Sequence, residues 1–200
     1  MSAKAHATAA ELDRAPVDGS VRDPTLRFVR RAAPALGAGL LLSFSSSFGQ
    51  TFFLSLFGGV WREEFNISHG AFGALYAFAT LSSAVCLLAV GKTVDHVPPS
   101  RIALILLVMI ALAALWLSSA ANVLALGAGL FAMRVLGQGL LSHLAMTTVA
   151  KWFDAARGRA LGIATLGFPI GEAMLPVAAA SAMGTFGWRA VWLGVAAFAA

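Results

Sequence analysis

The sequence predicts an all-α polytopic membrane protein, and three observations support this fold class. Apolar residues make up 59% of the 200-residue chain, charged residues make up only 12%, and the mean hydropathy is +0.82. A soluble domain of this size could not bury so much apolar surface in one core. Apolar segments follow one another along the chain, and the basic residues collect in the short segments between them, as expected of membrane-flanking charge.

Six apolar segments predict six helices, and a helix needs about 20 residues to cross the hydrocarbon core. Residues 1–33 are polar and mixed in charge, so they are predicted to form a disordered cytoplasmic tail, with residues 34–200 as the transmembrane domain. The sixth segment is shorter than a full span, so the chain is expected to stop inside a helix. The segments cover residues 34–60, 70–90, 101–119, 123–149, 160–182 and 188–200.

The distribution of basic residues predicts the orientation. Eleven lie in the tail and in the second-to-third and fourth-to-fifth connections, whereas only Arg62 and Arg189 lie in connections on the opposite side. This bias places the N-terminus in the cytoplasm. Four tryptophans near predicted helix ends are expected to anchor the helices at the membrane interfaces: Trp61, Trp116, Trp152 and Trp188.

Several function classes are disfavoured. The single Cys86 excludes an intrachain disulfide, and without clustered cysteines and histidines no metal site or cofactor is expected. The net charge of +5 is spread between apolar segments, so no nucleic-acid partner is expected. An intramembrane protease would need a serine nucleophile and a histidine at similar depth. Gly19-Ser20 lies in the tail and His143 near one surface, so the chain is not expected to be an enzyme.

Five connecting and helical segments follow one another in a recognisable order. They are GKTVDHVPPSR (91–101), RVLGQG (134–139), KWFDAARGRALGI (151–163), GIATLGFPIG (162–171) and TFGWRAVW (185–192). Together they resemble the major facilitator superfamily of secondary transporters, specifically its N-terminal six-helix half. The closest is RVLGQG, which is similar to the helix-four signature of that family. Pro98 in the second-to-third loop departs from the family pattern, where a glycine is usual.

The resemblance implies a six-helix bundle with a 3+3 inverted repeat, half of a transporter that moves a small solute by alternating access. It implies a bacterial inner-membrane location, a symporter or antiporter mechanism, and a cytoplasmic gating loop at Gly91, Asp95 and Arg101. The expected partners are the small-molecule substrate, the lipid bilayer, and a second six-helix half or another copy of the chain. The alternative is a non-transporting scaffold or a regulatory half-transporter fragment.

Two charged residues lie deep in predicted helices. Arg134 lies about 17 Å below the outer end of its helix and Glu172 about 18 Å above the inner end of its own, at 1.5 Å per residue. Both therefore arrive near the midplane of a core about 30 Å thick. They are expected to face each other or share one cavity, with Arg134 binding an anionic substrate group and Glu172 exchanging a proton. A static ion pair that locks the two helices is the alternative.

Other polar residues complete the predicted substrate and proton pathway. Gln138 lies one turn after Arg134 on the same face, Gln50 is expected to line a polar cavity, and Tyr76 is a less certain member because an interfacial tyrosine would be unremarkable. The serines around residue 45 are expected to bond their own helix. Pro169 and Pro176 are expected to kink the fifth helix between them.

Overall fold

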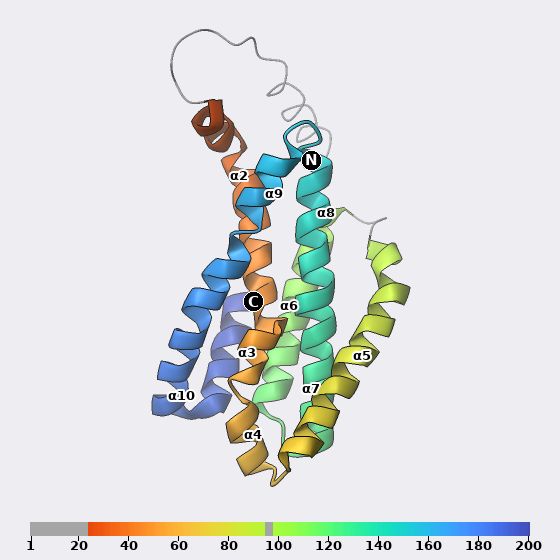
Figure 1. The fold of residues 1–200 in the computed structure, drawn as a ribbon, viewed down its shortest axis with the longest axis vertical. Helices are drawn as coiled ribbons and strands as arrows, with labels where there is room; N and C mark the ends of the chain where they lie inside the picture. The colour runs from red at the N-terminus through yellow and green to blue at the C-terminus, as the bar shows by residue number, and fades with distance from the viewer. Residues whose placement is uncertain (1–23, 95–97) are drawn as a thin grey trace.

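A computed structural model of the chain describes residues 24–94 and 98–200, and every regular element in these ranges is helical (Figure 1). Five helices in this part of the chain are long and apolar enough to cross a membrane, which agrees with the predicted all-α membrane fold. The five candidate spans are Phe28–Ser55, His69–Gly91, Pro99–Ser118, Val123–Trp152 and Arg157–Ala199. Two of the spans are single helices, α5 (His69–Val94) and α6 (Pro99–Ser118).

The first span is interrupted in its last third. Helix α2 (Pro24–Ser46) leads into a 3-10 turn, η1 (Ser47–Gly49), and α3 (Thr51–Ser55) and α4 (Gly58–Glu64) follow. Helix α2 begins at Pro24, so residues 24–33 are helical although they were predicted to lie in the tail. Residues 1–23 of that predicted tail lie outside the described residues.

Serine side chains precede the break and bond to their own helix, as predicted. The Ser43 hydroxyl donates to the Gly39 carbonyl at 3.0 Å, and the Ser46 hydroxyl donates to the Ser43 carbonyl at 2.7 Å. Hydroxyls that compete for helix carbonyls in this way bend helices. Gln50 then adopts an extended conformation, with φ −76° and ψ 154°, and separates η1 from α3.

The fourth span is interrupted at the same place in the bundle. It consists of α7 (Val123–Met133), a π-helix η2 (Arg134–Leu141) and α8 (Ser142–Trp152). The backbones of the two interruptions touch at a pair of glycines. A Cβ on Gly49 would lie 2.2 Å from the Met133 carbonyl oxygen, and a Cβ on Gly137 would lie 2.8 Å from the Gly49 Cα. Only glycine allows this approach.

The last span contains α9 (Arg157–Ala164) and the 33-residue α10 (Gly167–Ala199). Gly187 breaks the helical conformation of α10 with φ 79° and ψ 165°. Figure 1 shows that α10 reverses direction within its length. The kink predicted between Pro169 and Pro176 does not break the helix, because α10 keeps a helical backbone from Gly167 past Pro176 as far as Gly187. Pro169 stands in the first turn of α10, where a missing N–H leaves no bond unmade, and the helix is interrupted at Thr165 and Leu166.

An aromatic cluster fills the core near α4. Trp61 stacks on Phe57 with ring centroids 5.2 Å apart and on Trp192 at 6.2 Å, and Trp188 meets Trp61 edge-on at 6.0 Å. Trp61 is 0% exposed and Trp188 is 6% exposed, so the prediction that these two anchor a membrane interface is wrong. Trp116 remains 53% exposed. Position near a helix end does not tell a tryptophan facing lipid from one facing a neighbouring helix.

Candidate functional site

Arg134 lies where the two interrupted spans meet. It is the first residue of the π-helix η2 and is 7% exposed. Its Nη1 donates a hydrogen bond to Thr51 Oγ1 at 3.0 Å and a longer one to the Gly49 carbonyl at 3.4 Å. Both acceptors are available because η1 ends at Gly49 and α3 begins at Thr51, so the break in the first span presents polar atoms to the arginine.

Tyr76 brings α5 into the same site. The Arg134 Cζ lies 5.4 Å from the centre of the Tyr76 ring, within the range of a cation–π interaction. Tyr76, the less certain member of the predicted pathway, thus lies against Arg134, and the pathway role of both residues stays a prediction. Helix α5 packs along both α7 and η2, which fixes Tyr76 beside the arginine.

Several polar atoms near these residues are buried without a hydrogen-bond partner in the part of the chain that the structure describes. They are Arg134 Nε, Tyr76 Oη, Thr80 Oγ1 and Gln138 Oε1. Each such atom costs about 1–3 kcal/mol when it stays unsatisfied. Gln138 lies on η2 with Arg134 itself, and Thr80 lies one turn after Tyr76 on α5, so these unsatisfied atoms belong to η2 and to the helix packed against it.

The charge of Arg134 has no counterion among the described residues. No carboxylate of that part of the chain lies within 4.0 Å of its guanidinium; the ion pairs there are Arg157–Asp154 and Arg189–Glu64. Thr51, the Gly49 carbonyl and the Tyr76 ring are all neutral. A buried charge without a partner destabilises a fold by several kcal/mol. A purely structural role for Arg134 would therefore lower the stability of the protein without a compensating gain.

Glu172 is not the partner of Arg134 in this conformation. Its side chain is exposed on α10, and the predicted ion pair is absent. The neighbouring Gly171 explains the orientation, because it packs against Ser47 so closely that a Cβ would lie 2.4 Å from the Ser47 hydroxyl. Gly171 therefore faces the first span and Glu172 points away from that contact. That the two charges share one cavity stays a prediction.

The remaining predicted residues make no hydrogen bond or ring contact with Arg134 in the part of the chain that the structure describes. Gln50 is half-buried at the break, next to Thr51, and its side chain makes no hydrogen bond within the described ranges. Gly91 lies near the end of α5 and Arg101 is exposed in the first turn of α6. Asp95 lies outside the described residues. The gating role of these three stays a prediction.

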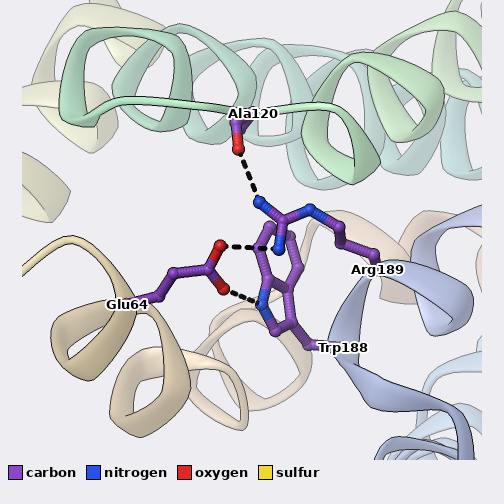
Figure 2. A network of polar contacts seen from close by, with 4 residues as sticks. All are labelled: Glu64, Ala120, Trp188 and Arg189. Atoms are coloured by element: carbon purple, nitrogen blue, oxygen red, sulfur yellow. Dashed lines mark hydrogen bonds and ion pairs between the residues drawn. The ribbon is translucent and has the colours of Figure 1, made fainter.

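A second polar network joins α4 to the residues just after Gly187 (Figure 2). Arg189 pairs with Glu64 at 2.6 Å, donates to the Ala120 carbonyl at 3.0 Å and lies over the Trp188 ring at 4.3 Å. Trp188 Nε1 donates to the other Glu64 oxygen at 2.5 Å. Burial raises the pKa of the Glu64 carboxyl. The bonds from Trp188 and Arg189 and the charge of Arg189 outweigh that effect and hold the pKa below its ordinary value of 4.5.

Sequence reasoning missed Thr51, Thr80 and this second network. Thr51 is adjacent to Gln50 in the polar stretch SFSSSFGQTFF, so its position in that stretch was a signal that could have identified it. Thr80 has a weaker signal, its spacing of four residues from Tyr76. No local pattern links Glu64 to Arg189, because the pairing depends on how distant helix ends meet.

Comparison with known proteins then decides the family. Residues 39–200 match the model of the Major Facilitator Superfamily. The chain belongs to this superfamily. It is also 30% identical over 112 residues to the riboflavin transporter RibJ of Trypanosoma cruzi (strain CL Brener). The match covers 55% of this chain and 24% of that protein, so it spans about a quarter of the relative. No solved structure matches the chain significantly.

Membership of the major facilitator superfamily agrees with the helices of the structure. The family match and the long apolar helices identify a multi-pass membrane protein of a transporter family, as the sequence motifs predicted. The Arg134 site lies within the matched region, on the first, second and fourth spans.

Proposed function

We propose that this protein works as a secondary active transporter that moves a small solute across the cytoplasmic (inner) membrane by alternating access. The observation that carries the proposal is the buried Arg134, whose charge lacks a counterion among the described residues and which lies between two interrupted helices. Interrupted helices and ionisable groups inside a membrane mark substrate and ion sites. The RibJ relative is named for riboflavin transport, which supports a small organic solute in general.

The proposed topology has six crossings, with residues 34–200 forming the transmembrane domain. The span Arg157–Ala199 has 43 residues, which at 1.5 Å per residue would be about 65 Å, twice a hydrocarbon core of about 30 Å. The break at Gly187 divides this length into one segment long enough to cross and a returning segment of about 18 Å, which we assign to a sixth crossing. Six crossings allow a 3+3 inverted repeat, and the excess of basic residues argues for a cytoplasmic N-terminus.

A second six-helix half or another copy of the chain is proposed to cover the exposed face of α10. Glu172 is exposed on this helix, and a carboxylate inside a membrane faces protein or a water-filled cavity rather than lipid. The loop with Gly91, Asp95 and Arg101 would then gate the cytoplasmic side of the interface. The apolar residues exposed around Glu172 are Leu166, Ile170, Met174 and Val177.

Ion coupling is proposed to reside in Glu172, which would take up and release a proton during the cycle, together with the pathway residues Gln50, Gln138 and Tyr76. The rival is a scaffold or regulatory half-transporter that moves no solute. Two charged residues inside apolar spans argue against the rival, because a scaffold gains nothing from the free-energy cost of burying Arg134.

The experiment is transport by the purified chain in proteoliposomes, with its oligomeric state measured in detergent. Riboflavin and a panel of radiolabelled small anions serve as solutes, with a pH gradient of either sign. We expect gradient-dependent flux that Glu172→Gln makes insensitive to pH and that Arg134→Lys reduces. Flux of every solute at the rate of protein-free vesicles would favour the scaffold.

A further inference from the structure

We propose that Arg134 binds the carboxylate of the transported solute through the edge of its guanidinium formed by Nε and Nη2. This inference rests on the proposed function and deepens it by naming the substrate class, a small carboxylate that also carries a hydroxyl. Within the described chain, one side of the guanidinium makes hydrogen bonds and the other side makes none.

The two sides of the guanidinium differ. Nη1 is occupied by Thr51 Oγ1 at 3.0 Å and the Gly49 carbonyl at 3.4 Å, whereas Nε and Nη2 make no hydrogen bond within the described ranges. The hydrogens of Nε and Nη2 point in the same direction from the planar group. They therefore match the two oxygens of a carboxylate, which arginine binds through two parallel hydrogen bonds.

The neighbours hold this edge in a fixed orientation. Thr51 and Gly49 fix one nitrogen from the break in the first span, and the Tyr76 ring covers one face of the group at 5.4 Å. A guanidinium that is already oriented loses less conformational freedom when a ligand binds. Arg134 is 7% exposed, so its free edge lies in an enclosed site rather than towards lipid. A solute reaches Nε, which is fully buried here, in a conformation in which this site is open.

The rest of the site argues for a hydroxyl on the solute. Tyr76 Oη, Thr80 Oγ1 and Gln138 Oε1 are buried without partners among the described residues. The first two lie on α5, and Gln138 lies on η2 with the arginine itself. A hydroxyl both donates and accepts hydrogen bonds and so can satisfy an amide oxygen and a phenol alike. A carboxylate with a nearby hydroxyl would therefore supply both the missing negative charge and the missing hydrogen bonds.

The rival counterion is Glu172, the single carboxylate that the sequence has inside a candidate span. It is exposed on α10 and forms no ion pair within the described part of the chain. A movement of α10 that brought Glu172 to Arg134 would fill the same edge. The test therefore has to separate a free carboxylate from this internal one.

The experiment is nuclear magnetic resonance of the full chain in lipid nanodiscs, following the arginine Nε–H signals. The Arg134 signal is identified by its loss in Arg134→Lys. The probe is glycolate, the smallest carboxylate with a hydroxyl, and its neutral isostere glycolamide is the matched control, with sodium chloride added to equal ionic strength. We expect glycolate to move the Arg134 signal saturably, and glycolamide and chloride to leave it in place.

Saturation transfer to the glycolate CH₂ protons extends the test to the variants. Binding should weaken at least tenfold in Arg134→Lys, which keeps the charge but loses the paired donors, and should be unchanged in Arg189→Lys. Thr51→Val, which frees Nη1, should weaken it several-fold.

Two outcomes would overturn the inference. One is an Arg134 signal that glycolate leaves in place or that glycolamide moves equally. The other is a signal that glycolate leaves in place but Glu172→Gln moves in the solute-free protein, which would assign the edge to Glu172. Because binding is measured at equilibrium, glycolate binding without solute flux would refute the proposed transport function alone, and flux without carboxylate binding would refute this inference alone.

Discussion

Arg134 and Arg189 are both held by several contacts, but their surroundings differ in charge. Arg189 meets the Glu64 carboxylate at 2.6 Å, lies over Trp188 and donates to a backbone carbonyl (Figure 2). Arg134 is more deeply buried, yet its described partners are a hydroxyl, a backbone carbonyl and an aromatic ring. Arg189 therefore joins helices through a carboxylate of the same chain, whereas Arg134 is proposed to take its anion from the solute.

Replacing each arginine by methionine tests this comparison most directly. Arg134→Met should lower solute flux by about 10²–10⁴-fold, because it removes the two proposed charge-assisted hydrogen bonds to the solute, each of about 1.5–3 kcal/mol. Its Tm should stay the same or rise, since an unpaired buried charge is removed. Arg189→Met should keep flux within a few-fold and lower the Tm by about 2–4 °C. The measurements are proteoliposome flux and thermal unfolding; a larger fall in Tm for Arg134→Met would make Arg134 structural.

Gly49→Ala should disrupt the contact between η1 and η2 that positions the partners of Arg134, and should lower the Tm. The new Cβ would lie 2.2 Å from the Met133 carbonyl oxygen, so η1 and η2 must separate, at a cost of about 1–3 kcal/mol. Gly37→Ala is the matched control, because Gly37 lies on the same span and a Cβ there meets nothing within 4 Å. Thermal unfolding should show a lower Tm for Gly49→Ala alone, and equal values would contradict the close approach.

Gly187→Ala tests the turn that brings Trp188 and Arg189 to Glu64. At φ 79° and ψ 165° an alanine is strained by about 1–3 kcal/mol. No atom lies within 4 Å of a Cβ at this position, so the effect is conformational. Gly194→Ala, which also has open space around its Cβ but ordinary helical φ, is the control. A lower Tm in both variants, or in neither, would contradict the strained backbone conformation at Gly187.

Acidification should weaken the Arg189 network and leave Arg134 unaffected. The pKa of Glu64 is lower in the folded protein than its ordinary value of 4.5, so its stabilisation is complete above pH 4.5 and is lost as the pH falls through the lowered pKa. The effect should be about 0.2–1 kcal/mol, since the pair is partly exposed. Unfolding of the wild type and Glu64→Gln between pH 6 and 3 should converge at the acid end; curves that stay parallel would contradict this.

Much of the fold could be predicted from the sequence because hydropathy reports burial in lipid directly. The predicted segments 70–90, 101–119 and 123–149 agree with α5, α6 and the fourth span to within a few residues. The breaks could not be predicted. A π-helix and an extended Gln50 differ from an α-helix in a few backbone bonds, and these are fixed by the contact of Gly49 with Gly137 rather than by local sequence.

The candidate site was predictable in part. Arg134 follows from its depth in an apolar segment, and Tyr76 does contact it. The ion pair with Glu172 was expected because two opposite charges at one depth should attract each other. Depth along the membrane normal does not define the direction in which a side chain points, and the packing of Gly171 on Ser47 turns Glu172 away.

The tryptophans around Trp61 also give the protein an optical signal of its own. Three of its five indoles lie within this cluster, with centroid distances of 6.0 Å and 6.2 Å from Trp61 to Trp188 and Trp192. Indoles this close couple electronically, so the cluster should give a near-ultraviolet circular dichroism band that depends on how α4 meets the part of α10 after Gly187. Movement of these two segments during the proposed transport cycle would be visible without an attached dye.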